Sequence, residues 1–573
     1  MLSVVHLESY TSYKEYLETH KIRVPIDSFI CYSIQKFVNS NFVSIKFIPI
    51  RTEPENLKPS VTLVEGEGEK FNFLINEYDI PWTVALCEYP VVMVDDIIIT
   101  GLCAVTRQIC MFRNSHLLPQ EHEDGLLGFR QTCLQAPNEV SVWTKFCEIE
   151  IIRAVQELLT GNDIKEVPEP LVRFEDHMRQ PVRIHNVYKV AQNLKKKEIV
   201  IDCSTRVEDL EVNHEFAEGP YLTLADLVLL PSYHVIIQSI GEAQFETLLP
   251  FTYKWYKNLT SLNYIQETFM SLMSHFNLKQ LPINNMTIPT ADDVSLYKCD
   301  PKRHNPKKRN YTNSDDIEKA LSSITEGLEV PMFDNEYQPT FRWLDIPEPA
   351  NPFAGYLPNT RVQRKSEQLQ NLALPVLKMA TDGDVIVDFC CGTGHLGILL
   401  AYLLPRCTII LLENKIESLC RAKERVQKMK LRNVYYYQCN LDFFTGEFDI
   451  GIGLHACGIA TDLILDKCLK QNAKFVLSPC CYGAIHGTCR MEYPRSKKFA
   501  NVPFDDYLYI AHGADQTHKE HPLAVRGARC MAIIDSDRAR LAEEFGYKVT
   551  LMTLKPITCT PKNNLLIGIS TEK

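Results

Sequence analysis

The sequence lacks the long apolar run that a membrane span requires. A spanning helix needs about 18 or more uncharged apolar residues, whereas Pro405 and Arg406 interrupt the apolar stretch 398–412 and Pro231 interrupts the stretch 227–240. The amino terminus also lacks a basic segment followed by about 7–15 apolar residues, which is typical of a secretory signal. We therefore expect a cytoplasmic protein without a membrane anchor.

Paired cysteine spacing and an excess of positive charge are missing too. The chain contains 20 cysteines, but no two of them have CxxC spacing, so they predict scattered reduced thiols rather than a disulfide scaffold. The formal net charge is −10, which disfavours broad electrostatic adhesion to nucleic acid, although a local basic surface could still bind a specific RNA.

The length and the order of sequence patterns predict several domains. A chain of 573 residues exceeds a single core, since domains usually contain about 100–200 residues. Helical patterns such as Val142–Leu159 and Thr223–Ile237 predict an all-α region between 139 and 280. The stretch 298–351 is rich in Pro, Asn and charge, including the basic run 302–309, and predicts a linker.

The carboxyl-terminal part alternates short β-rich runs with helical stretches. This alternation predicts a doubly wound α/β fold with a parallel sheet covered by helices. The β-rich runs that we interpret as parallel strands are Val385–Phe389, Thr408–Leu412, Phe448–Leu454 and Phe475–Ser478.

A glycine-rich turn joins the first of these strands to an apolar helix. Gly392 and Gly394 allow positive φ and let the backbone approach a ligand closely, while Gly397 lets the helix pack tightly on the strand. Glu413 ends the second strand about 20 residues later, where its carboxylate can accept hydrogen bonds from ribose hydroxyls. Asp388 lies beside the loop and would repel a pyrophosphate, but it suits the ammonium and sulfonium groups of S-adenosylmethionine. We expect this cofactor rather than NAD.

The string 387–401 resembles motif I of class I methyltransferases, and Glu413 resembles their ribose-binding acid. Cys390 stands where that family usually has its first glycine, so its backbone must have negative φ or accept strain. The runs 548–554 and 564–569 resemble the antiparallel hairpin that closes the family's sheet.

A second family segment suggests where the adenine would bind. The run 438–444 is similar to the segment that holds the adenine, and the resemblance implies that Asn440 or Asp442 lies near the amino group. The alternative is a solvated turn without a ligand.

Two further turns follow parallel strands at the edge where ligands bind in such sheets. His455 could act as a general base near neutral pH, since an unperturbed imidazole titrates near pH ~6.5, and Asp462 could orient it. The alternative for Asp462 is an ordinary acidic residue at a helix start. Cys457, Cys480 and Cys481 together with His455 also allow a zinc interpretation, but without paired spacing we predict buried thiols and no metal.

The strings 455–462 and 480–481 resemble motifs of the eukaryotic tRNA 2′-O-methyltransferases that modify the acceptor stem. This resemblance implies a tRNA or another structured RNA as the partner and a ribose hydroxyl as the nucleophile, which needs a base. The loop Arg490–Phe499 interleaves basic and aromatic residues and could contact phosphates and stack a base, or it could be a solvated charged loop.

The amino-terminal half contains a helix-start pattern, a capping box of Thr223 and Asp226. Around it, 117–281 resembles the carboxyl-terminal domain of glutathione transferases, and 90–107 resembles the second half of their thioredoxin-like domain, with Pro90 in the place of a cis-proline. The family's Glu-Ser pair, which holds the γ-glutamyl group of glutathione, would fall near Thr100 and is missing. A binding module, with a protein partner or in a homodimer, is the better interpretation.

The whole chain resembles a family that joins such a half to a methyltransferase-like domain. We predict a multidomain fold, α followed by α/β, and a methyltransferase that modifies RNA; the alternative is a non-catalytic interaction protein. The predicted domains are a degenerate thioredoxin-like region (1–116), a helical domain like the glutathione S-transferase C-terminal domain (117–290), a linker (291–350) and a Rossmann-like methyltransferase domain (351–573).

Overall fold

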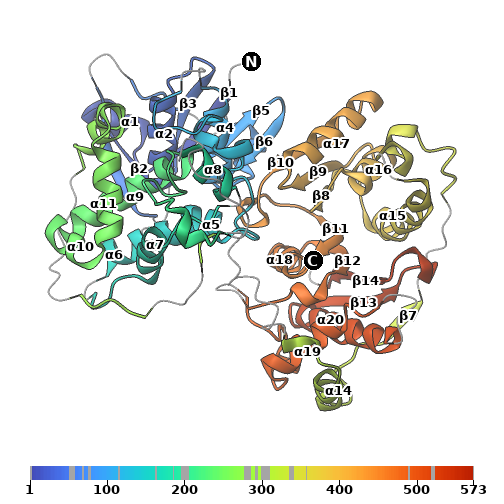
Figure 1. Ribbon diagram of the computed structural model, residues 1–573. Helices are drawn as coiled ribbons and strands as arrows, with labels where there is room; N and C mark the ends of the chain where they lie inside the picture. The colour runs from blue at the N-terminus through green and yellow to red at the C-terminus, as the bar shows by residue number, and fades with distance from the viewer. Residues whose placement is uncertain are drawn as a thin grey trace. The chain divides into compact units, whose positions relative to one another are not determined.

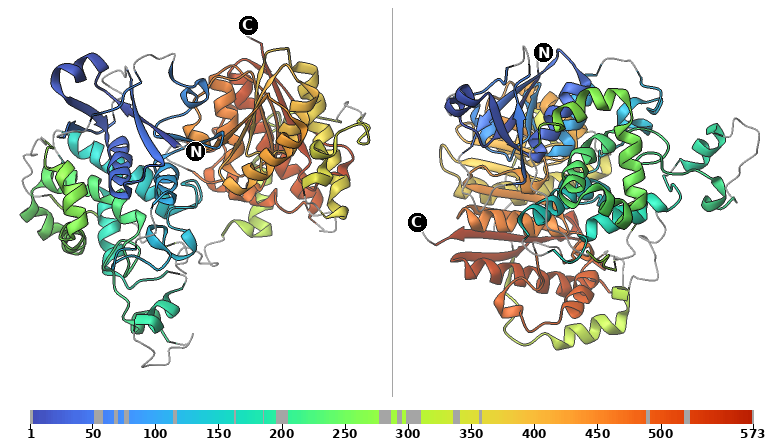
Figure 2. Two further views of the ribbon diagram at one scale, coloured as in Figure 1. Left: turned by 90° about the horizontal axis from the view of Figure 1, so that it is seen from above. Right: turned by 90° about the vertical axis from the view of Figure 1, so that its left-hand side faces the viewer.

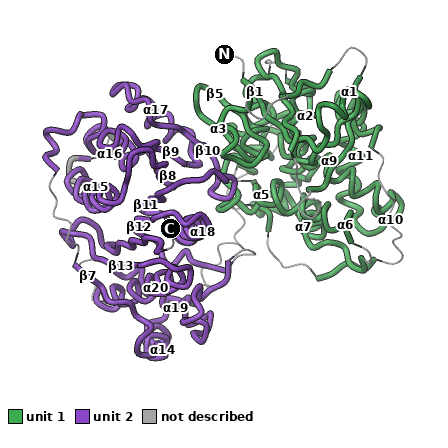
Figure 3. Tube along the Cα trace, turned by 180° about the vertical axis from the view of Figure 1, so that it is seen from behind, with its two compact units in different colours: residues 1–305 green, residues 306–573 purple. Residues whose placement is uncertain are grey.

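The structure is a computed structural model that divides into two compact units, Met1–Asn305 and Pro306–Lys573 (Figure 3). The finer domain division at 116 and 350 stays a prediction. The basic run 302–309 and Arg490 lie outside the described residues. The structure describes residues 3–50, 58–66, 70–74, 79–113, 117–161, 164–184, 186–194, 205–276, 286–290, 295–297, 310–334, 341–355, 358–487, 491–517 and 523–571.

The first unit begins with a small mixed sheet (Figure 1). Its strands lie in the order β3-β1-β5-β6, with β1 parallel to β3 and antiparallel to β5. Helices α2 and α4 follow β2 and β6 along the chain, and β2 pairs with β4 in a separate antiparallel ribbon. The bounds are β1 Ser3–Ser9, α1 Tyr13–Thr19, β2 Lys21–Pro25, α2 Ile26–Val38, β3 Val43–Pro49, β4 Ser60–Val64, α3 Trp82–Ala85, β5 Val91–Val94, β6 Ile97–Thr100 and α4 Leu102–Met111.

The rest of the first unit is helical among the described residues apart from isolated bridges, as the sequence predicts. Helix α9, Leu224–Ile240, is apolar on all sides and almost entirely buried, so the other helices pack around it. Its start has the predicted capping box, in which the backbone N–H of Thr223 donates to Asp226 (2.9 Å). The other helices are α5 Val142–Lys145, α6 Ile151–Thr160, α7 Glu169–Arg179, α8 Val187–Leu194, α10 Glu242–Leu248, α11 Pro250–Thr260, α12 Asn263–Ile265 and α13 Ser271–Met273.

One predicted helix is interrupted. The run 142–159 forms α5 and α6 with a π-helical turn, Phe146–Glu150, between them. Such turns add a residue to the helix and change the direction of the side chains around it. The prediction that the peptide bond before Pro90 is cis is confirmed.

The second unit contains one large sheet with the order β10-β9-β8-β11-β12-β14-β13-β7. The five neighbouring strands β10, β9, β8, β11 and β12 are parallel to one another. Strand β14 runs antiparallel to both β12 and β13. The predicted doubly wound sheet and its closing hairpin are therefore present. The bounds are β7 Met332–Asp334, β8 Val385–Phe389, β9 Thr408–Glu413, β10 Val434–Gln438, β11 Ile450–Cys457, β12 Lys474–Cys480, β13 Tyr547–Thr553 and β14 Asn564–Ser570.

Helices cover both faces of this sheet (Figure 2). The connections run outward in both directions from β8 and β11, and right-handed crossovers therefore place α16 and α17 on one face and α18 and α20 on the other. Strands β8 and β11 lie next to each other where the order reverses, which is where such sheets bind ligands. The helices are α14 Ser314–Ser323, α15 Asn359–Met379, α16 His395–Leu403, α17 Ile416–Met429, α18 Ile459–Lys470, α19 Phe504–Gly513 and α20 Ala524–Glu544.

Strand β11 differs from its predicted bounds. It starts at Ile450 and continues to Cys457, so His455 and Cys457 belong to the strand and not to the turn after it. Among the described residues, no single helix is long and apolar enough to cross a membrane; α9 and α10 pass that test only when taken together across a 108° bend.

Candidate functional site

The turn between β8 and α16 has the backbone that its glycines predict. Gly392 and Gly394 have φ of 56° and 72°. A Cβ on Gly397 would lie 2.3 Å from Leu411 Cδ2, so only glycine lets α16 pack this closely on β9. Cys390 has φ of 54°, which means that the backbone accepts the left-handed conformation where the methyltransferase family has glycine.

Glu413 lies against this loop. Its Oε2 accepts a hydrogen bond from the backbone N–H of Gly392 (2.9 Å), and its Oε1 accepts from the N–H groups of Asn414 (3.0 Å) and Lys415 (3.2 Å). A Cβ on Gly392 would meet no atom within 4 Å. The loop backbone and the carboxylate therefore border open space, as a nucleoside site requires.

The predicted adenine residues lie just after β10. Asn440 is 7% exposed, and its side chain makes no capping hydrogen bond to the short turn that follows it. Asp442 is half-buried and is the middle residue of the short turn Leu441–Phe443. The donor set fits an adenosine-type cofactor.

Asp388 is buried at the end of β8 and stabilises the start of α16. The side chain is 2% exposed, and its Oδ2 accepts a hydrogen bond from the backbone N–H of Gly397 (2.9 Å). Burial raises the pKa of Asp388 to about 7, and Glu413 adds to the rise while Lys365 opposes it. The carboxyl group fixes the start of α16; its contact with a cofactor stays a prediction.

Arg425 is a further loop residue that the sequence analysis missed. This buried side chain of α17 donates from Nη1 to the carbonyl oxygen of Thr393 (2.8 Å) and from Nε to that of Pro349 (2.8 Å). It ties the loop to the segment before α15. An arginine in an amphipathic helix looks like an ordinary surface residue in the sequence, so no pattern could have indicated this role.

His455 lies on β11 and contacts α15. Its Nε2 is 3.0 Å from Oε1 of Gln368, whose own Nε2 donates to the carbonyl oxygen of Cys559 (2.8 Å). Because this second bond fixes the amide, Oε1 of Gln368 must accept a hydrogen bond from the N–H at Nε2 of His455. In the neutral ring, Nδ1 therefore carries the lone pair.

The surroundings of His455 contradict the expectation that it titrates near neutral pH. Burial, together with the nearby positive charge of Lys365, lowers the pKa of His455 to about 4. The imidazole is therefore neutral at physiological pH. Burial lowers the pKa of Lys365 itself to about 8.

The hydrogen bonds of Asp462 go to Arg538 and Tyr493 and not to His455. The carboxylate is fully buried on α18 and accepts two hydrogen bonds from Arg538, at 2.9 and 2.7 Å, and one from the Tyr493 hydroxyl at 3.0 Å. Arg538 also pairs with Asp535 (3.0 Å). The structure thus places Asp462 in a buried ion-pair network between α18 and α20, in place of the predicted orienting role.

The described part of the predicted loop, residues 491–499, contributes Tyr493 and Arg495 to the same network. Tyr493 is 6% exposed, and Arg495 donates to Asp466 (2.7 Å). A buried ring cannot stack on a base, so the expectation for Tyr493 is wrong. Lys497 and Lys498 remain exposed.

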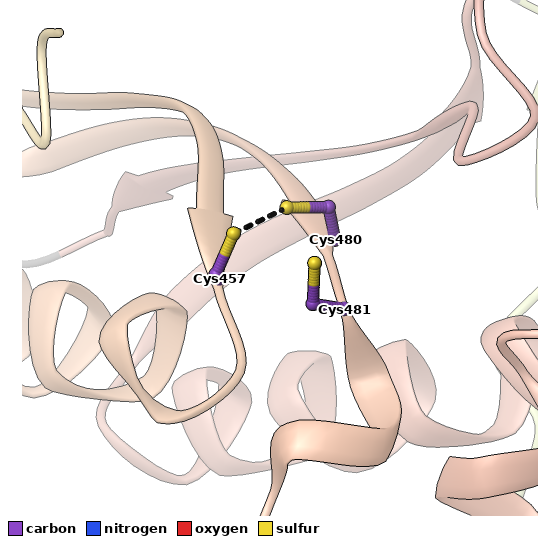
Figure 4. Close-up of side chains that lie close together, drawn as sticks. All are labelled: Cys457, Cys480 and Cys481. Atoms are coloured by element: carbon purple, nitrogen blue, oxygen red, sulfur yellow. Dashed lines mark hydrogen bonds between the residues drawn. The ribbon is translucent and has the colours of Figure 1, made fainter. Parts of the chain in front are cut away.

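Cys457, Cys480 and Cys481 come together at the ends of β11 and β12 (Figure 4). The Sγ atoms of Cys457 and Cys480 are 3.2 Å apart. Thiol hydrogen bonds from its two neighbours lower the pKa of Cys457 to about 6. Cys457 and Cys481 are exposed, which contradicts the expectation of buried thiols for these two, whereas Cys480 is buried.

In the first unit, the start of α4 is the place where the Glu-Ser pair of glutathione transferases would fall, the pair that this sequence lacks. Gly101 precedes this helix, and the hydroxyl of Thr100 donates to the carbonyl oxygen of Glu88 (2.5 Å). Glu148, in the π-helical turn, accepts a hydrogen bond from the backbone N–H of Cys103 (3.1 Å). The carboxylate of Glu148 therefore already occupies the helix start, where free N–H groups would bind an anion.

A family model described as a methyltransferase domain matches residues 361–488. With the doubly wound sheet and its glycine loop, this match defines the second unit as a Rossmann-like methyltransferase domain. The chain belongs to the family of glutathione S-transferase C-terminal domain-containing proteins. The Drosophila melanogaster homolog is 42% identical over 491 residues, covering 82% of this chain and 83% of that protein. The Xenopus laevis protein is 32% identical over 619 residues, covering 96% and 99%.

Two solved structures show low overall similarity to this chain. The fibrillarin/Nop5p complex is 12% identical with a TM-score of 0.23, covering 36% of this chain and 82% of that chain. TYW2 from P. horikoshii, in complex with MeSAdo, is 14% identical with a TM-score of 0.22, covering 37% and 62%. The assignment of the fold rests on the strand order and on the family model.

Proposed function

We propose that the chain is an S-adenosylmethionine-dependent methyltransferase that acts on structured RNA, with a ribose 2′-hydroxyl of tRNA as the acceptor. The observation that carries this proposal is the open space beside Gly392, bordered by the Glu413 carboxylate. Glu413 would hold the ribose, Gly392 and Gly394 would let the loop approach the cofactor, and Asn440 or Asp442 would contact the adenine. When bound, the cofactor supplies an electrophilic methyl group.

His455 supports transfer to a hydroxyl group. A hydroxyl is a poor nucleophile and needs a base within hydrogen-bond reach. Since Nε2 of His455 carries a proton and donates a hydrogen bond to Gln368, Nδ1 of His455 is the atom that would accept the hydroxyl proton. The tRNA assignment itself rests on the resemblance of the strings 455–462 and 480–481 to tRNA 2′-O-methyltransferases.

The first unit supplies a binding module in this proposal. Its strand order β3-β1-β5-β6 followed by helices is consistent with a degenerate glutathione-transferase-like half. A cavity of about 510 Å³, lined by Trp143, His177, Tyr221 and Glu218 among others, lies in this unit. It favours a second candidate function, an interaction protein without catalysis that binds a partner or forms a homodimer. A cytoplasmic location is part of both proposals.

Cofactor binding by the full chain tests the enzyme proposal first. Isothermal titration calorimetry should give saturable binding of S-adenosylmethionine or S-adenosylhomocysteine. Absence of binding up to millimolar concentration would leave the interaction protein as the surviving function. The substrate is then found by comparing modified nucleosides in RNA from cells with the protein, without it, and with His455→Ala. A 2′-O-methylated nucleoside missing from the last two samples identifies the product.

A further inference from the structure

Three cysteine side chains at the ends of β11 and β12 converge on one point. The Sγ atoms of Cys457, Cys480 and Cys481 all lie within 4.8 Å of one another. Figure 4 shows the three sulfurs pointing toward one another from β11, from β12 and from the turn after β12. Within the described ranges, this is the one group of histidine, cysteine and acidic side chains that places three ligand atoms so close together.

An irregular backbone produces this convergence. Leu454 pairs with Ser478 and Ala456 with Pro479, so His455 is an extra residue in β11, with φ of 66°. Because of this bulge, Cys457 lies opposite Cys480.

The second irregularity is at Cys481. Successive side chains on a regular strand point to opposite faces, but Cys481 has φ of 51° in the left-handed region and its sulfur turns back toward Cys480. The backbone N–H of Gly458 donates to the carbonyl oxygen of Cys480 (3.1 Å), which holds the two strand ends together. Two non-glycine residues in an unfavourable conformation therefore serve to bring the sulfurs together.

We propose that Cys457, Cys480 and Cys481 bind one zinc ion as thiolates, with the fourth coordination position open to solvent. A Zn–S distance of about 2.3 Å in tetrahedral geometry places neighbouring sulfurs about 3.8 Å apart. This value lies between the shortest contact, 3.2 Å, and the 4.8 Å limit of the cluster. A disulfide would need two cysteines with sulfurs about 2.05 Å apart, and it would leave the third sulfur unexplained.

The surroundings leave the fourth position to water. The nearby carboxylate of Asp515 already accepts from the backbone N–H groups of Tyr482 (3.1 Å) and Gly483 (2.9 Å), and it pairs with Lys562 (2.8 Å). Cys457 and Cys481 are exposed, so an ion and a water molecule can reach the sulfurs. Three protein ligands with one open position are the arrangement of catalytic zinc sites.

Metal analysis of the full chain tests this site. Protein purified with a reductant and without a chelator should contain about one zinc per chain by mass spectrometry of the metal. Cys457→Ser and Cys481→Ser should each lower the zinc content at least fivefold, while Cys420→Ser, at an exposed cysteine of α17, should keep it. Both test positions are exposed, so circular dichroism is expected to show folded variants; Cys480→Ser is a third variant at the buried ligand.

Cobalt provides a second readout. Reconstitution of the metal-free chain with Co²⁺ should give thiolate-to-cobalt charge-transfer absorption, which weakens in Cys457→Ser and Cys481→Ser and not in Cys420→Ser. A reduced wild-type chain that binds neither zinc nor cobalt would overturn the proposal, as would one equivalent of zinc in all variants. A Cys457–Cys480 disulfide in a chain that binds no metal would assign a redox pair instead. The result is independent of S-adenosylmethionine binding, so this proposal and the methyltransferase proposal can fail separately.

Discussion

A substitution of Glu413 can test cofactor binding in a chain that stays folded. Its carboxylate is half-buried and borders open space beside the loop. If it accepts hydrogen bonds from ribose hydroxyls, Glu413→Ala should weaken S-adenosylmethionine binding by roughly 1.5–3 kcal/mol, the range for hydrogen bonds to a charged group. Calorimetry on the folded variant gives the dissociation constant. An unchanged value would place the ribose elsewhere, and Glu417→Ala, in the first turn of α17, is the matched control.

His455 gives a prediction about pH. As a general base it must be unprotonated, and its pKa is lowered to about 4. The part of the methylation rate that depends on His455 should therefore stay level from about pH 8 to pH 5 and fall only as the pH approaches 4, because protonation then removes the lone pair. A midpoint near ~6.5, the value of an unperturbed imidazole, that disappears in His455→Ala would contradict the burial of this ring, whereas one that persists belongs to another group such as Asp388, whose pKa is raised by burial to about 7.

Two substitutions separate the role of His455 as the base from the role of Gln368, which orients it. His455→Ala should lower the single-turnover rate by about 10²-fold, the lower end for general bases, because a weakly basic group contributes less. Cofactor affinity should not change. Gln368→Leu removes the acceptor of the Nε2 proton and should give a smaller loss together with a shifted pH profile. Circular dichroism at each pH excludes unfolding as the cause.

At the level of elements, the loop between β8 and α16 allows a matched pair of glycine substitutions. Gly392 and Gly383 both have positive φ, 56° and 96°, and a Cβ on either would meet no atom within 4 Å. An alanine in a left-handed conformation costs about 1–2 kcal/mol, so both variants should be destabilised similarly in urea. Only Gly392→Ala should also lose cofactor affinity, by about tenfold or more, because its methyl group enters the proposed site. Equal affinity in both variants would contradict that position of the cofactor.

The network between α18 and α20 supports a prediction about stability. Arg538 is 1% exposed and donates to both oxygens of Asp462. Arg538→Met leaves a buried carboxylate without its main partner, and breaking a buried ion pair typically costs about 3–5 kcal/mol. Urea denaturation should show this loss, whereas Arg529→Met, at a half-exposed arginine of the same helix, should change stability by less than about 0.5 kcal/mol. A small effect for Arg538 would mean that solvent reaches Asp462.

The sequence predicted elements whose pattern is local and missed contacts that depend on the fold. Strands β8 and β14 end within one residue of their predicted limits, since an apolar run and flanking turn residues define each of them. Gln368 could not be linked to His455, because 87 residues separate them and only the packing of α15 brings them together. The sequence allows a zinc interpretation of Cys457, Cys480 and Cys481 but favours separate buried thiols, because the bulge at His455 that brings their sulfurs together has no signature in the sequence.

At the scale of the whole molecule, the two units differ at the helix starts where a ligand could bind. One is the start of α16, and the other is the start of α4. The start of α16 in the second unit borders open space beside Gly392. The start of α4 in the first unit already holds the carboxylate of Glu148, which also accepts a hydrogen bond from the Asn138 side chain (2.8 Å). The first unit therefore fills the start of α4 with its own carboxyl group, which leaves no free position there for the γ-glutamyl group of glutathione.

This difference predicts that the full chain does not use glutathione. The γ-glutamyl carboxylate would have to displace Glu148 from the N–H of Cys103, and the position of the family's anchoring serine is taken by Gly101, which offers no hydroxyl. Burial raises the pKa of Glu148 to about 7, but the protonated carboxyl still fills the same space. The chain should therefore not be retained on immobilised glutathione, and it should not conjugate a generic electrophile faster than the solution reaction. An active glutathione transferase on the same resin is the positive control. Retention of the wild-type chain that free glutathione reverses would show that Glu148 yields its position to the ligand, and the first unit would then be a glutathione-binding module after all.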